Sequence, residues 1–244
     1  MALTTWAARR LTDYSDAQSL GARFRRQRMG PLIEMMVAVA ARKGQVSIID
    51  VGGTEEYWNI LPPGAMERWD VHITIANIAC PLNGRANPRF EHVEVDGCDL
   101  RQYADRQFDI AHANSVIEHV GDWDRMVRFA SEIRRLASAY FVQTPNYWFP
   151  VEPHCMTPII HWLPKPARIA LVRRYSLGHW PKASTVSDAV RIVESARLLN
   201  RPMMSALFPD ATLLVERVLL LPKSIVAVRS PWHGRPTLSG PYAA

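Results

Sequence analysis

The sequence predicts an α/β fold built on a parallel, doubly wound sheet, and two observations support this. Five short apolar segments rich in β-branched residues alternate with segments of helical spacing, and such alternation is typical of a parallel sheet with helices on both faces. The chain of 244 residues is 48% hydrophobic and 21% charged, which is enough for the full core of one domain. We therefore expect a single α/β domain with a modest insertion.

The elements follow in order along the chain. Two helices are predicted before the first strand: a basic one over residues 16–29, and a second over 32–42 that Pro31 opens and Gly44 ends. Asp122 is a suitable cap for a later helix whose apolar residues recur at helical spacing up to Leu136. The five strands are predicted at residues 46–51, 71–77, 90–95, 108–113 and 139–143.

The last hundred residues have a different character. Seven prolines and several aromatic residues lie between Pro145 and Pro181, which allows only short helices and predicts a lid. A helix over 186–199 follows. Two strand-like runs, 211–221 and 223–229, are separated by Pro222 and predict an antiparallel hairpin at the sheet edge.

Charge and cysteine usage narrow the functional class. The net charge of +6 is concentrated in a few basic segments, which we interpret as solvated helix faces, because no RNA-binding signature accompanies them. No apolar run reaches the roughly 18 residues of a membrane span, and no secretory signal pattern is found, so we expect a cytoplasmic protein. Cys80, Cys98 and Cys155 lack C-x-x-C spacing, which favours reduced thiols over a disulfide framework or a zinc cluster.

A glycine pair after the first strand indicates a site for a nucleotide-type cofactor. Asp50 stands at the carboxyl end of the strand, and Gly52 and Gly53 let a ligand approach the backbone without a Cβ in the way. A tight βα turn explains the pair equally well, so the motif gains meaning only from its surroundings. Neither the Tyr-x-x-x-Lys pair of short-chain dehydrogenases nor the Gly-Lys-Ser/Thr of a P-loop is present.

Two segments together resemble a known family. Residues 49–54, IDVGGT, resemble the first motif of class I S-adenosylmethionine-dependent methyltransferases, and residues 108–120, FDIAHANSVIEHV, resemble their fourth-strand motif, in particular that of the bacterial small-molecule, methyltransferase-11-like branch. The closing hairpin is similar to the family's last two strands. The resemblance implies a Rossmann-like sheet of seven strands in the order 3-2-1-4-5-7-6, with S-adenosylmethionine as cofactor and S-adenosylhomocysteine as product.

The resemblance also implies how the single domain, residues 1–244, is divided. Its parts are the N-terminal helices (1–44), a cofactor-binding half (45–144), a lid or substrate insertion (145–183), the C-terminal helix and hairpin (184–230) and a loose tail (231–244).

Carried over by position, the resemblance places Gly52 and Gly53 under the amino-acid portion of the cofactor, with Asp50 holding its ammonium directly or through water. Thr54 and Glu56 stand where further glycines are usual. These two departures allow an alternative in which the fold is degenerate and only binds a ligand or partner.

The rest of the implied cofactor site comes from the next strands. Asn77 takes the place of an acidic residue that grips the ribose hydroxyls, and an amide there loses the charge-assisted part of that bond. Asp96 matches the position that accepts from the adenine amine. The other matching positions are Gly97 and Cys98 beside the adenine, and Asn114 and Ser115 at the floor of the site.

The acceptor side is predicted from the chemistry of a methyl sulfonium, which is already a strong electrophile. The protein has to bind it, align the nucleophile and exclude water, and no catalytic residue is compulsory. For a hydroxyl acceptor a base helps, and His154 and His119 are the candidates, with a structural role as the alternative for each. His154 lies in the lid after strand five, where substrate loops emerge.

Other lid residues complete the predicted acceptor site. Tyr147, Trp148 and Glu152 are predicted to contact the substrate, although the aromatic side chains also suit simple packing of the lid. Glu152 and His154, with Cys155 and His161, are suitable metal ligands by type, but their spacing matches no recognised site and we predict no metal.

The sequence thus predicts an enzyme that transfers a methyl group to oxygen or nitrogen of a small-molecule or glycan-like acceptor. A degenerate binding protein is the alternative, and an RNA methyltransferase is less favoured because no appended RNA-binding module is recognisable. Binding to nucleic acid or to a membrane surface is not favoured.

Overall fold

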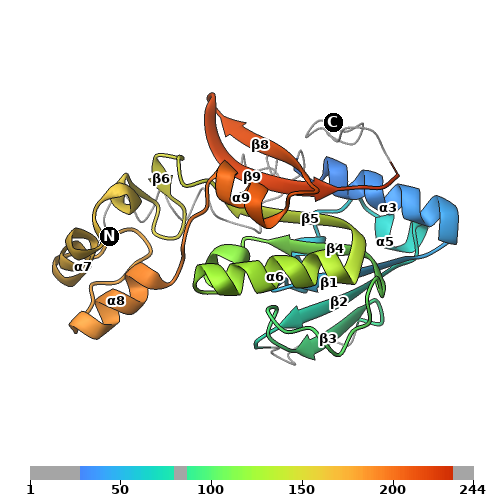
Figure 1. Ribbon diagram of the computed structural model, residues 1–244, viewed down its shortest axis with the longest axis horizontal. Helices are drawn as coiled ribbons and strands as arrows, with labels where there is room; N and C mark the ends of the chain where they lie inside the picture. The colour runs from blue at the N-terminus through green and yellow to red at the C-terminus, as the bar shows by residue number, and fades with distance from the viewer. Residues whose placement is uncertain (1–27, 80–86, 233–244) are drawn as a thin grey trace.

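The computed structural model describes residues 28–79 and 87–232, and its centre is a seven-stranded sheet (Figure 1). The strand order is β3-β2-β1-β4-β5-β9-β8. The first five strands are parallel, β9 runs antiparallel to β5, and β8 runs antiparallel to β9. The strands are β1 (Val46–Val51), β2 (Val71–Asn77), β3 (Phe90–Glu94), β4 (Phe108–Asn114), β5 (Ala137–Pro145), β8 (Thr212–Val218) and β9 (Leu221–Arg229). When two short strands outside this sheet are counted apart, this is the predicted order 3-2-1-4-5-7-6, and the fold prediction is confirmed.

Helices cover both faces of the sheet and enclose two separate cores. The first core lies under α3 (Gly30–Lys43), α4 (Glu55–Trp58) and α5 (Ala65–Arg68), and the second lies under α6 (Trp123–Leu136) and α9 (Arg201–Leu207). Side chains along a strand alternate between faces. In β1, Ile48 therefore packs into the first core and Ile49 into the second.

Local signals fix the helix ends as predicted. Gly44 ends α3 with a φ of 78°, and its N–H donates to the carbonyl of Ala40 at 2.8 Å. Asp122 caps α6, because its Oδ1 accepts from the N–H of Arg125 at 2.9 Å, an interaction worth about 1 kcal/mol. The predicted helix over 16–29 lies almost wholly outside the described residues.

The predicted lid, residues 145–183, and the helix after it project together beyond one end of the sheet (Figure 1), and both are called the lid from here on. Their elements are β6 (Val151–Glu152), β7 (Thr157–Pro158), the 3-10 turn η2 (Ile160–Trp162), α7 (Lys165–Arg174) and α8 (Val186–Glu194). A small core of four buried residues, Val172, Ala183, Ala189 and Val193, joins α7 to α8. Within the described residues, no helix is both long and apolar enough to cross a membrane.

Two predictions for the C-terminal part were wrong in detail. The helix predicted to run to residue 199 ends at Glu194, and α9, which was not predicted, begins after Asn200, whose side chain accepts from the N–H of Met203. The hairpin turns at Leu219 and Leu220, not at the proline, and both have a positive φ. Pro222 lies inside β9, opposite a register shift in β8 that accommodates a residue without an N–H.

Candidate functional site

A cavity of about 260 Å³ opens at the carboxyl ends of the parallel strands. This is the point where the chain leaves β1 and β4 in opposite directions across the sheet, the usual place for a ligand in such folds. Five of the residues predicted to bind a cofactor line it, namely Gly52, Asn77, Asp96, Gly97 and Ser115. The structure thus brings together residues that follow four different strands.

Gly52 is the residue on which the shape of this cavity depends most. It has a φ of 76°, and its N–H donates to the carbonyl of Ala76 at 2.7 Å. A Cβ at this position would lie 2.7 Å from both γ-carbons of Val116. A side chain here is therefore excluded by backbone conformation and by space together. Asn77 binds the same loop through a donation from its Nδ2 to the carbonyl of Gly53 at 3.4 Å.

Asp50 lies outside the cavity, on the face of the sheet that α4 covers. Its carboxylate is fully buried and accepts from Nε1 of Trp58 at 2.8 Å and bonds Nδ1 of His112 at 2.7 Å. Gly53 lies directly against it, since a Cβ on Gly53 would meet the carboxylate oxygen at 1.8 Å. In the structure Asp50 braces the glycine loop from behind, whereas we expected it to hold the ammonium of a cofactor.

His112 was not predicted to belong to the site. Asp50 and His112 are paired in the register of β1 and β4 and point to the same face of the sheet. The only signal in the sequence was that each is a polar residue inside an apolar strand.

Asp96 and Arg125 form the wall of the cavity after β3. Oδ2 of Asp96 accepts from Nη2 of Arg125 at 2.7 Å, and Oδ1 accepts from the N–H of Cys98 at 2.9 Å. Burial raises the pKa of Asp96, but the hydrogen bonds from Arg125 and Cys98 outweigh it, so the net pKa is lowered and the carboxylate is ionised. Each carboxylate oxygen keeps a second lone pair for a ligand donor.

Cys98 itself does not line this cavity. Burial and the charge of Asp96 raise the pKa of its thiol to about 11. Gly97 does line the cavity, and its backbone also packs closely, since a Cβ there would lie 2.6 Å from Cγ1 of Val51.

The floor of the cavity is formed where β4 ends. Ser115 has a φ of 55°, a strained conformation for a residue other than glycine, and both its N–H and its hydroxyl bond Gln143. Oδ1 of Asn114 is buried and has no hydrogen-bond partner among the described residues. Thr54 is exposed at the start of α4 and is not part of the lining.

A second cavity, of about 570 Å³, lies in the lid. Predicted substrate residues Tyr147 and Glu152 line it, whereas Trp148 does not and is 58% exposed. Its wall combines aromatic and basic side chains, including those of Trp162, Trp180, Lys165, Arg168 and Arg197. Nε of Arg168 is buried without a hydrogen-bond partner in the described part of the chain.

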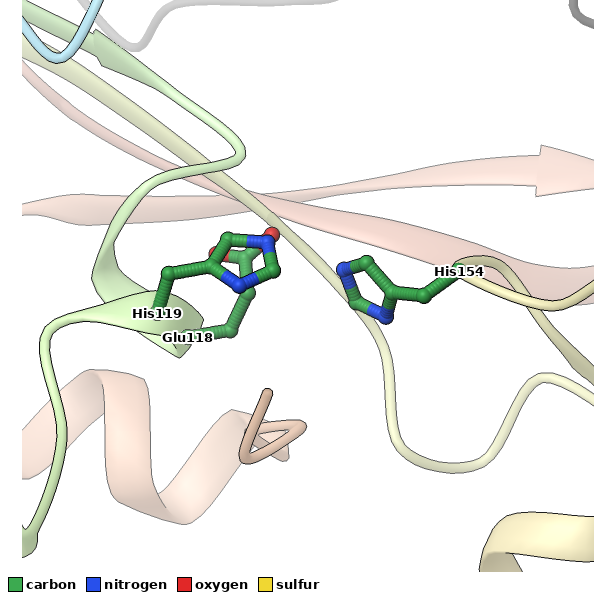
Figure 2. Close-up of side chains that lie close together, drawn as sticks. All are labelled: Glu118, His119 and His154. Carbon is green, nitrogen blue, oxygen red and sulfur yellow. The ribbon is translucent and has the colours of Figure 1, made fainter. Parts of the chain in front are cut away.

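Four side chains connect the two cavities. His119 lines the cavity at the strand ends, and its ring lies 4.7 Å from that of His154, edge to face at 84°. Nδ1 of His154 is 2.7 Å from Oε1 of Glu152, which lines the lid cavity. Glu118 lies against this pair of histidines, as Figure 2 shows. The two histidines predicted from sequence are thus brought together between the cavities.

Glu118 was not predicted to belong to the site. It is 1% exposed, and burial raises the pKa of its carboxyl to about 7. Burial lowers the pKa of His154, but its bond to Glu152 outweighs this and raises the pKa overall. Glu152 shows the reverse: burial raises the pKa, and the bond from His154 together with the N–H of Cys155 gives a net lowering. For His119, desolvation lowers the pKa despite a bond to the carbonyl of Ser195.

Two of the lid residues considered as metal ligands are engaged elsewhere. Cys155 is buried, and its N–H donates to Glu152 at 2.7 Å. Nε2 of His161 donates to the carbonyl of Tyr147 at 2.9 Å, and Nε1 of Trp162 donates to the same oxygen. They hold the lid together, and the side chains that converge are those of Glu118, His119 and His154.

Comparison with known proteins places this geometry in a fold. No protein-family model matches the chain. An uncharacterized protein of Mycobacterium tuberculosis is 38% identical over 55 residues, which is 22% of this chain and 19% of that protein. The chain thus matches less than a fifth of the length of this curated relative.

Solved structures match over more of the chain. The trans-methyltransferase CalH, in complex with SAH, has a TM-score of 0.52 at 12% identity, over 88% of this chain and 61% of that one. The magnesium protoporphyrin IX methyltransferase of Synechocystis PCC 6803 has a TM-score of 0.49 at 13% identity, over 92% and 91%. The strand order of the sheet and the likeness to CalH show that the chain has the Rossmann-like fold of class I methyltransferases.

Proposed function

We propose that the protein is an S-adenosylmethionine-dependent methyltransferase that acts on a small-molecule acceptor. The observation that carries the proposal is the pairing of two cavities: one at the carboxyl ends of the strands, lined by Gly52 and Gly97, and one in the lid, with His119 and His154 between them. A cofactor in the first cavity and an acceptor in the second meet at these histidines.

The first cavity suits the cofactor part by part. The amino-acid portion lies over Gly52, where the backbone comes close without a side chain. The ribose lies at Asn77, and the adenine amine donates to Asp96 beside Gly97. Asp50 supports the loop from behind through His112 and Trp58 and does not itself touch the ligand.

The lid cavity favours an acceptor with an apolar ring and an anionic group. Trp162 and Trp180 offer flat apolar surfaces, and Arg168 offers a guanidinium whose Nε has no partner within the described residues. Oxygen or nitrogen at the junction then attacks the methyl carbon in line with sulfur. Holding the two reactants in place supplies roughly 7 to 11 kcal/mol of the barrier reduction.

Calorimetry with the purified chain tests the proposal. We expect S-adenosylmethionine and S-adenosylhomocysteine each to bind with one site per chain, and adenosine, which lacks the amino-acid portion, to bind more weakly. If neither cofactor form gives heat or a thermal shift, the enzyme proposal is wrong. A degenerate fold that binds another ligand or partner, which Asn77 and the altered glycine motif permit, then takes its place.

A further inference from the structure

Three potential metal-ligating side chains converge at the junction of the two cavities. Glu118 and His119 come from the turn that follows β4, and His154 comes from the lid after β6 (Figure 2). One ligand atom from each, a carboxylate oxygen and two imidazole nitrogens, lies within 4.8 Å of the others. Two histidines and one carboxylate are a common donor set for first-row divalent metals.

In each of these three side chains, one polar atom points away from the other two side chains. That atom makes a hydrogen bond that fixes the orientation of the side chain. Nδ1 of His119 is 2.7 Å from the carbonyl of Ser195, and Nδ1 of His154 is 2.7 Å from a carboxylate oxygen of Glu152. Both partners only accept, so each Nδ1 carries a hydrogen, and Nε2 is the ring nitrogen left to bind an ion. Histidines that ligate metals are oriented in the same way, by a carboxylate or a carbonyl behind them.

Glu118 supplies a second, independent indication of a ligand. Its Oε2 accepts from the hydroxyl of Thr144 at 3.0 Å, but its Oε1 is buried and has no hydrogen-bond partner among the described residues. The side chain is 1% exposed, so bulk solvent does not reach this oxygen. A buried carboxylate oxygen without a partner is unfavourable, and a cation between it and the two rings satisfies it.

We propose that Glu118, His119 and His154 bind one divalent transition-metal ion of the Zn²⁺ class. Nitrogen donors favour such an ion over Mg²⁺ or Ca²⁺, which prefer oxygen ligands. Three protein ligands leave a coordination position open, as in catalytic zinc sites. Bonds of about 2.0 to 2.2 Å require the three donors to come closer together than 4.8 Å, so we expect the His119 and His154 rings to turn towards Glu118 when the ion binds.

The role of the ion rests on the proposed function, whereas the binding itself does not. In methyl transfer, a hydroxyl of the acceptor takes the open position and loses its proton to water, and its oxygen forms the new bond to the methyl carbon. The bond between that carbon and sulfur breaks, and its electron pair stays on sulfur to give S-adenosylhomocysteine. The ion lowers the pKa of the hydroxyl and keeps its oxidation state.

The test begins with the full chain freed of metal by a chelator and titrated with Zn²⁺ alone in a calorimeter. We expect one ion per chain. Glu118→Gln keeps the volume but loses the charge, and His154→Ala removes a ligand, and each lowers the affinity for Zn²⁺ by at least 10- to 100-fold. His72→Ala is the matched control, because His72 is an exposed histidine of β2, and it should leave the affinity for Zn²⁺ unchanged.

Co²⁺ gives a second measurement on the wild-type chain, so that the result does not depend on how the variants fold. Visible absorption bands of a tetrahedral or five-coordinate site are expected, and their loss in His154→Ala assigns them to this group. The inference is overturned if neither ion binds stoichiometrically, or if both variants bind Zn²⁺ as tightly as the wild type does. If the chain binds S-adenosylmethionine but not Zn²⁺, the metal site alone is rejected. If it binds Zn²⁺ but neither cofactor form, the proposed function alone is rejected.

Discussion

The two cavities are built in different ways. The cavity at the strand ends rests on the large core under α6 and is shaped in part by close-packed backbone, as at Gly52 and Gly97. The lid cavity rests on a core of four residues and is shaped by long aromatic and basic side chains. Under the proposed function, the first cavity holds the cofactor and the second holds the acceptor. Changes in one region should therefore leave the other working.

Gly52→Val is expected to have the largest effect on one cavity while leaving the other unchanged. The new side chain meets Val116 at a contact of 2.7 Å and a φ of 76° opposes it, so we expect the affinity for S-adenosylmethionine to fall by roughly 100-fold or more, which is about 2.7 kcal/mol. Calorimetry measures this loss, and Zn²⁺ binding at the junction should persist.

Gly44→Val is the matched control for that experiment. Gly44 has nearly the same φ, 78°, but a Cβ there meets nothing within 4 Å. This variant carries the backbone strain alone and should bind the cofactor as the wild type does. Equal losses in the two variants would mean that strain, and not the close approach at Gly52, accounts for the effect.

A glycine in the lid allows the reverse experiment. Gly178 has a φ of 56°, and a Cβ there would lie 1.6 Å from the carbonyl oxygen of Cys155, so Gly178→Ala forces the lid backbone to move. We expect the free energy of local unfolding of the lid to fall by about 2 to 3 kcal/mol. Zn²⁺ should bind more weakly, because His154 lies in the lid, and cofactor affinity should be nearly unchanged. Hydrogen exchange of peptides from the lid and from β1 measures the two regions separately.

Gly64→Ala is the control, because Gly64 has a φ of 70° and open space where a Cβ would be placed. If exchange rises in β1 as much as in the lid of Gly178→Ala, the two regions unfold as one cooperative unit, and the contrast between them does not hold.

The same contrast explains what the sequence predicted well. The parallel strands and the glycine loop carry local signals: a short apolar, β-branched run that includes Ile48 and Ile49, and a glycine pair after the strand that contains them. Those signals suffice because the site at the strand ends follows from the fold itself. The turn at Leu219 and Leu220 was not predicted, because Pro222 is a stronger local signal than two leucines with positive φ.

The junction depends on contacts between segments far apart in the sequence. The bond from His119 to Ser195 joins residues 76 apart, and Oε2 of Glu118 accepts from Thr144 on β5, 26 residues further along the chain. Glu118 looked like an ordinary polar residue within a motif, and only the three-dimensional structure shows that it is buried. A metal site made from a turn and a lid therefore has no spacing that a sequence motif can record.

The smallest effect is expected from Asp210→Asn, which concerns the sheet and neither cavity. Asp210 accepts from the hydroxyl of Tyr140 at 2.7 Å and pairs with Arg134 at 2.9 Å and Arg229 at 3.4 Å. Burial raises its pKa, but the Tyr140 bond and the two arginines outweigh this and lower it overall. The folded pKa is thus below the unfolded value of about 3.9, so the carboxylate stabilises the fold above that pH, and this contribution is lost as the pH falls through the folded pKa.

Urea unfolding of wild type and Asp210→Asn measures that contribution. We expect the variant to be less stable by about 1 kcal/mol at neutral pH, and the difference to close towards pH 3 and below, as the wild-type carboxyl is protonated. Asp105→Asn is the control, because its carboxylate, 77% exposed, also pairs with an arginine and should cost less than about 0.5 kcal/mol. Cofactor affinity, Zn²⁺ affinity and lid exchange should all stay as in the wild type. A change in lid exchange in this variant would show that the stability of the sheet reaches the lid through β5, and that the lid core is not independent.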